Sequence, residues 1–180
     1  MNRWTLFAAA FAAVLATGCE RSDQTQSNSP GTHEPAAALP PGLILAESPP
    51  QAKNVVEAKK EAQIGEEVVV RGRIGGRGEP FVENRAIFQL VDSSLPTCAD
   101  NPGDGCKTPW DYCCEPKDQI TAKSMTVQIV GADGKPLRTN LKGQGGLVPM
   151  AKVVIRGKVE QKPDENTMTV RADGIYVEQS

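Results

Sequence analysis

Residues 65–74 read GEEVVVRGRI and residues 153–159 read VVIRGKV, and the likeness of these two stretches is the main evidence for the fold. In each stretch apolar side chains alternate with other residues around an Arg-Gly pair, which is typical of a strand with two different faces. The inward set predicted for the first stretch is Val68, Val70 and Ile74, and that for the second is Val153, Ile155 and Val159. Glycine inside a strand marks a place where the backbone coils tightly or is closely approached. The two stretches therefore predict two strands of similar design.

Three further runs have strand character, at residues 86–92 (AIFQLVD), 125–130 (MTVQIV) and 167–178 (TMTVRADGIYVE). Phe88 is predicted to point inward. Residues 51–63 are good helix formers and predict one short helix before the strands. Five strands without long helices between them favour an antiparallel arrangement, and closure into a barrel removes the exposed edges. The predicted class is an all-β, five-stranded barrel with a short N-terminal helix.

The order of these pieces resembles the OB-fold, in which a glycine-containing first strand is echoed by the fourth. The resemblance covers residues 65–180. In its anticodon-binding branch the second strand reads Phe-x-Asp-Leu-Arg-Asp, whereas Ile87 and Val91 stand here where the stacking Phe and the phosphate-facing Arg would be. A net charge of −2 also disfavours nucleic-acid binding. Nucleic-acid or oligosaccharide binding thus follows only from analogy of fold.

The amino-terminal residues 1–18 read as an export signal, with Arg3 followed by a short apolar run. The segment Leu-Ala-Thr-Gly-Cys at residues 15–19 resembles the lipobox of bacterial lipoproteins. That resemblance implies cleavage before Cys19, lipidation of its thiol and anchoring of the mature chain to a membrane; an ordinary secretory signal is the alternative. Glu20 is not the Asp that marks inner-membrane retention, so the expected address is the outer membrane, facing the periplasm.

Residues 19–50 are rich in Ser, Gln, Pro and Ala and contain no aromatic residue. Such a composition buries too little apolar surface to offset its conformational entropy, so it predicts a disordered tether. The chain's one histidine, His33, lies in this segment. The folded domain is expected to be residues 51–180.

Residues 93–124 form a connection far longer than a barrel needs, and such loops are usually functional or disordered. They contain Cys98, Cys106, Cys113 and Cys114. An even number of cysteines in an oxidising compartment predicts disulfides, with the adjacent pair bonded separately to the other two. The alternatives are a zinc or cuprous site, with Asp100, Asp104 and Asp111 nearby, and thiol exchange. The spacing is not that of a zinc ribbon, and there is no C-x-x-C.

Two groups of residues are candidate partner surfaces. Trp110 and Tyr112 either cap the cysteine segment against the barrel or present an exposed contact surface. The second group, which consists of Arg71, Arg73, Arg156 and Lys158, predicts one outward basic stripe that Glu66, Glu67 and Glu160 could neutralise. A protein or an anionic glycan would fit such a stripe.

No catalytic residue or cofactor is predicted. The expected function is a membrane-anchored, non-enzymatic binding or scaffold module, with metal handling or thiol redox chemistry at the four cysteines as the alternative.

Overall fold

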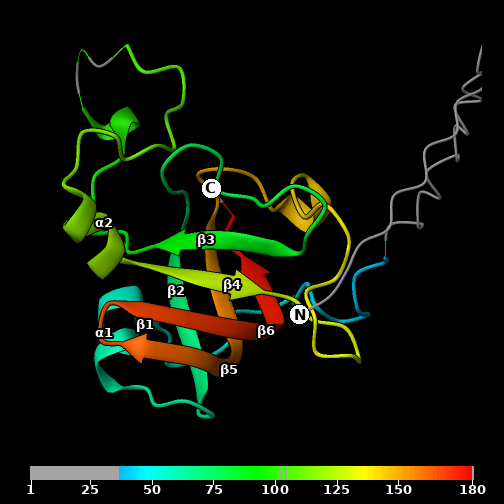
Figure 1. Ribbon diagram of the computed structural model, residues 1–180. Helices are drawn as coiled ribbons and strands as arrows, with labels where there is room; N and C mark the ends of the chain where they lie inside the picture. The colour runs from blue at the N-terminus through cyan, green and yellow to red at the C-terminus, as the bar shows by residue number, and fades with distance from the viewer. Residues whose placement is uncertain (1–36, 102, 104, 180) are drawn as a thin grey trace, which may run out of the picture. The chain divides into compact units, whose positions relative to one another are not determined.

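The computed structural model describes residues 37–179 except residues 102 and 104 (Figure 1). The chain divides into two units, Met1–Glu34 and Pro35–Ser180, and the second holds the fold. The predicted signal peptide, Cys19, His33 and Asp104 lie outside the described residues.

Five strands close into a barrel: β2 (Glu67–Ile74), β3 (Ile87–Val91), β4 (Ser124–Gln128), β5 (Lys152–Asp164) and β6 (Thr167–Val177). Their order around the sheet is β2-β3-β4-β6-β5, and pairing of β5 with β2 closes it. The β4–β6 pair is parallel, and the other four pairs of the barrel are antiparallel. A two-residue strand, β1 (Lys53–Asn54), adds parallel to β2. The all-β, OB-fold-like barrel predicted from the sequence is confirmed.

The barrel interior holds the apolar faces that the alternation predicts. Val70, Ile74, Phe88, Val153 and Ile155 have no exposed surface. The predicted inward orientation of Phe88 is therefore confirmed.

The glycines of the two echoed stretches lie where backbone and side chains approach most closely. A Cβ built on Gly157 would lie 2.2 Å from the Arg171 carbonyl oxygen, and one on Gly72 would lie 2.7 Å from a Leu90 carbon. The β5–β6 register shifts between Arg156 and Gly157. The echoed glycines thus allow the sheet to curl tightly enough to close.

The predicted helix forms as α1 (Val55–Glu61), which packs against β2 and β4. Asn54 caps it in a capping box with Glu57. The barrel also caps the first turn of α1, because the carboxylate of Asp92, which follows β3, accepts a hydrogen bond from the Val56 N–H at 3.0 Å. Burial alone would raise the pKa of Asp92, but the N–H groups of Ser94 and Val56 lower it below its ordinary value.

Residues 37–50 carry contacts that the predicted tether would lack. Leu43 is 2% exposed and belongs to the main core. Ile44 forms a parallel bridge with Ile175. The Ile175 carbonyl accepts the Leu45 N–H at 2.8 Å, and the Ile175 N–H donates to the Leu43 carbonyl at 2.7 Å. These bonds extend the ordered domain to the N-terminal side of residue 51, because Leu43 finds apolar surface beside β6. Among the described residues, no helix is both long and apolar enough to cross a membrane.

A candidate thiol cluster between β3 and β4

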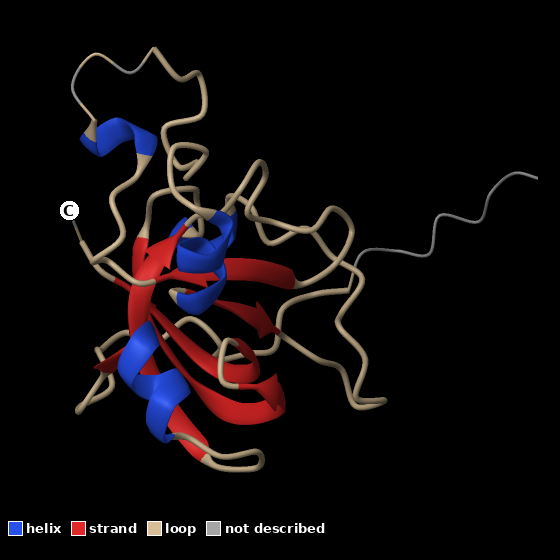
Figure 2. Cartoon of the chain, turned by 60° about the vertical axis from the view of Figure 1, so that its left-hand side comes forward, coloured by secondary structure: helices blue, strands red, loops and turns tan. Residues whose placement is uncertain are grey.

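The long connection between β3 and β4 stands at one end of the barrel, drawn in green at the upper left of Figure 1 and at the top of Figure 2. We call residues 93–101, 103 and 105–116 the head. It contains a short 3₁₀ turn, Cys98–Asp100, and it is followed by α2 (Lys117–Ala122), which leads into β4. The sequence did not predict α2.

The head has a small core of its own. Tyr112, which has no exposed surface, packs with Val91, Leu95 and Ile120 in a cluster separate from the barrel core. The Tyr112 ring also lies close to Gly75, the residue that follows β2, where an added Cβ would be 2.9 Å from the ring's Cε2. A long connection with buried apolar anchors is held in place on the barrel.

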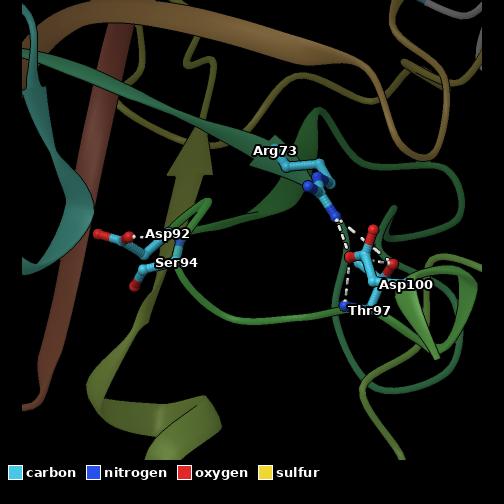
Figure 3. Close-up of polar contacts among 5 residues, drawn as sticks. All are labelled: Arg73, Asp92, Ser94, Thr97 and Asp100. Carbon is cyan, nitrogen blue, oxygen red and sulfur yellow. Dashed lines mark hydrogen bonds and ion pairs between the residues drawn. The ribbon is translucent and has the colours of Figure 1, made fainter.

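A polar network fixes the turn that carries Cys98 (Figure 3). The Asp100 carboxylate accepts hydrogen bonds from the Thr97 N–H at 2.8 Å and the Thr97 hydroxyl at 2.9 Å, and from the Arg73 guanidinium at 3.0 Å. These three donors, the Thr97 N–H foremost, lower the pKa of Asp100 to about 2. The sequence interpretation missed this role of Thr97 and Asp100, although Thr-x-x-Asp is the spacing of a capping box.

Three sulfurs gather beside this turn. Cys98 Sγ lies 3.4 Å from Cys113 Sγ, which lies 4.0 Å from Cys114 Sγ, and all three sulfurs are within 4.8 Å of one another. Cys98 is buried, whereas Cys113 and Cys114 are exposed. Cys106 is half-buried, with its sulfur 3.3 Å from the Thr108 hydroxyl oxygen. No disulfide joins these described cysteines, so the predicted disulfides remain predictions. The Cys98–Cys113 contact belongs to one of the two predicted pairings.

The thiol pKa values do not favour nucleophilic chemistry at the two contacting sulfurs. Burial raises the pKa of Cys98 to about 12. The hydrogen bond with Cys98 lowers the pKa of Cys113, but desolvation and the neighbouring Cys114 make the net shift upward. Hydrogen bonds from Thr108 lower the pKa of Cys106. Reactive cysteines have lowered pKa values, so Cys98 and Cys113 do not resemble catalytic nucleophiles.

The two aromatic residues of the head lie in different surroundings. Tyr112 is buried and caps the head against the barrel, so its side chain cannot belong to an outer contact surface. Trp110 is half-buried, and its indole N–H donates to the Gly78 carbonyl at 2.8 Å. The Lys142 ammonium lies 5.8 Å from the Trp110 ring centroid. Trp110 therefore remains a candidate contact residue at the edge of the head.

The predicted basic stripe lies on one face of β2 and β5, but its arginines are paired with acids. Arg71 contacts Glu178 at 2.7 Å, Arg73 contacts Asp100 at 3.0 Å and Arg156 contacts Asp173 at 2.6 Å. The fourth member, Lys158, stands opposite Glu67 in the β2–β5 register. Apart from Glu67, these acids are not the ones expected to neutralise the stripe. The pairing weakens the case for an anionic ligand on this face.

Comparisons with known proteins find little that is similar. No protein-family description matches the chain, and no curated protein sequence matches it. Among solved structures, the chain is similar to the hypothetical protein YgiW from E. coli, with 16% sequence identity and a TM-score of 0.36. That similarity covers 71% of this chain and 89% of the other.

Proposed function

We propose that the protein is an exported, lipid-anchored, non-enzymatic binding module whose contact surface is the head. Export and anchoring rest on the lipobox-like segment that ends at Cys19. The observation that carries the binding role is the attachment of the head to the barrel. Tyr112 and Asp100 hold it from two sides, through a buried ring and through a hydrogen bond from Arg73 of β2.

This attachment is a reason to assign binding to the head. A connection of this length inside a small domain is uncommon unless it is functional or disordered. Because buried side chains anchor this connection to the barrel, a functional role explains its length better than disorder does. A surface that is already ordered also loses less conformational entropy when a partner binds. The barrel thus serves as a rigid platform, and the head as the surface that meets the partner.

The anchor is tested by replacing Cys19. The full chain, expressed with its signal, is expected to fractionate with membranes and to give an intact mass that includes acyl chains. Cys19→Ser is expected to appear as a soluble or uncleaved protein without acyl mass. Equal membrane association of both proteins, without acyl mass in either, would contradict the anchor.

The contact surface is tested by photo-crosslinking in the intact cell envelope. A photoreactive residue at Trp110 samples the head, and one at Ile64, 63% exposed between α1 and β2, is the control. We expect a discrete covalent adduct from position 110 and none from position 64. Equal adducts from both positions, or none from position 110, would count against the head as the contact surface.

The second candidate function is metal handling or thiol exchange at the cysteines of the head, and the proximity of three sulfurs favours it. Counting titratable thiols in protein trapped with an alkylating agent during isolation separates the candidates. Complete oxidation would fit a head that disulfides brace. Reduced thiols would fit chemistry at the sulfurs.

A further inference from the structure

We propose that the sulfurs of Cys98, Cys113 and Cys114 form a binding site for a soft metal ion, and that Cu⁺ fits the site best. The inference rests on the second candidate function, metal handling by the head, because it names the ion and the ligands.

The spacing of the sulfurs suits a shared metal ion. Three thiolates around one ion at a typical metal–sulfur distance of about 2.3 Å lie about 4.0 Å apart when the arrangement is trigonal. The two measured separations are 3.4 Å for Cys98–Cys113 and 4.0 Å for Cys113–Cys114. The remaining pair, Cys98 and Cys114, is within 4.8 Å. Small side-chain movements would therefore bring all three sulfurs onto one ion.

The backbone that carries these ligands is already held. The Cys98 N–H donates to the Asp111 carbonyl at 3.0 Å, and the turn beyond it is fixed by Asp100. The vicinal pair follows Tyr112 directly, whose ring is buried and whose carbonyl accepts the Glu115 N–H at 3.0 Å. Ligands on fixed backbone lose little freedom when the ion binds, which favours affinity.

The donor atoms select the class of ion. Thiolates prefer soft ions such as Cu⁺ and Zn²⁺ over Mg²⁺ or Ca²⁺, which take oxygen ligands. The Cys106 sulfur contacts Thr108 and also interacts with Cys98 and Cys113, but only the other three sulfurs all lie within 4.8 Å of one another. Three thiolates can complete a trigonal Cu⁺ site, whereas Zn²⁺ in structural sites takes four protein ligands. The ion can enter from the solvent side, where Cys113 and Cys114 are exposed.

The test uses the full chain in detergent, reduced and kept free of oxygen. Cu⁺ and Zn²⁺ are titrated separately in competition with a chromogenic chelator. We expect one Cu⁺ per chain. Cys114→Ser is the main variant because Cys114 is exposed, and we expect it to weaken Cu⁺ binding by at least about 100-fold. The melting temperature of the metal-free chain should not change. Cys106→Ser is the comparison variant, and because its sulfur lies outside the set of three mutually close sulfurs, it should lose much less Cu⁺ affinity than Cys114→Ser.

Several results would overturn the assignment. One is unchanged Cu⁺ affinity in Cys114→Ser, and another is an equal loss in Cys106→Ser. Tight binding of Zn²⁺ but not Cu⁺ would reject the trigonal site. Recovery of a Cys98–Cys113 disulfide that reductant cannot open would remove two of the ligands. None of these results would alter acylation at Cys19 or crosslinking from position 110, so failure of the metal site is distinguishable from failure of the proposed function.

Discussion

Arg73 of β2 donates a hydrogen bond to Asp100 of the head across 3.0 Å, and this ion pair joins the barrel to the turn that carries Cys98. The Arg73 side chain is 12% exposed and that of Asp100 is 46% exposed. Screening by solvent limits the Coulombic part of the interaction at Asp100. The greater part of its effect should come from capping the turn, since Asp100 also accepts both Thr97 donors.

Asp100→Ala is therefore expected to loosen the head. Removing a capping carboxylate costs about 0.5–2 kcal/mol, and here the fully buried Thr97 would also lose its acceptor. We expect a lower free energy of unfolding and faster cleavage within the head in limited proteolysis. Glu165→Ala, which removes an exposed carboxylate in the turn between β5 and β6, is the control. Equal cleavage rates in both variants would show that Asp100 does not hold the head.

Tyr112 gives a second, sharper test of the same attachment. Its hydroxyl is buried and has no hydrogen-bond partner among the described residues. Tyr112→Phe should therefore leave the free energy of unfolding unchanged or raise it by up to about 1 kcal/mol. Tyr112→Ala should lower it by about 3–5 kcal/mol, because it empties the core of the head. Chemical denaturation measures both, and a large loss in Tyr112→Phe would reveal a partner for the hydroxyl.

The barrel was predictable because its signals are local and repeated. The alternation in β2 and β5 assigns Val70 and Ile155 to the interior, and the glycines at positions 72 and 157 mark the tight coils. Such a pattern does not depend on knowing the partner strand. For Tyr112 the sequence left two alternatives, burial against the barrel or exposure on a contact surface. Its burial depends on the separate small core of the head, which no local pattern predicts.

The remaining features depend on contacts between distant segments. Lys59 reaches the Asn166 carbonyl across 107 positions of sequence, and Leu43 finds its core beside Ile175. Neither contact leaves a periodic trace in the sequence. Cys98 and Cys113 were likewise known only as members of a set of four, and the fold of the head selects which sulfurs meet.

The echoed glycine of β5 should be the least replaceable residue of the barrel. A Cβ at Gly157 would lie 2.2 Å from the Arg171 carbonyl oxygen, well inside van der Waals contact, and that backbone cannot move without opening the β5–β6 pair. We expect Gly157→Ala to cost more than about 3 kcal/mol, the upper end of typical overpacking penalties. Gly105→Ala is the matched control, because its Cβ meets nothing within 4 Å. Comparable melting temperatures for the two variants would contradict the close approach.

Lys59 supplies a prediction about pH. This residue of α1 is 2% exposed, and its ammonium donates to the carbonyls of Thr121 and Ser124 at 2.7 Å each and to that of Asn166. Burial lowers its pKa from 10.5 to about 8. Between these two values the unfolded chain binds a proton that the folded chain has lost. The free energy of unfolding should therefore rise with pH across this window, by up to about 3 kcal/mol from this group.

Comparison with Lys59→Met isolates the contribution of this one group. Urea unfolding of both proteins at intervals from pH 7 to pH 11 gives their difference in stability, in which titrations common to both chains, such as that of Tyr112, cancel. We expect the unaltered chain to gain on the variant as pH rises above about 8, because deprotonation relieves the cost of a buried ammonium. A difference that stays constant over the whole range would show that the three carbonyls offset burial and hold the pKa at its ordinary value.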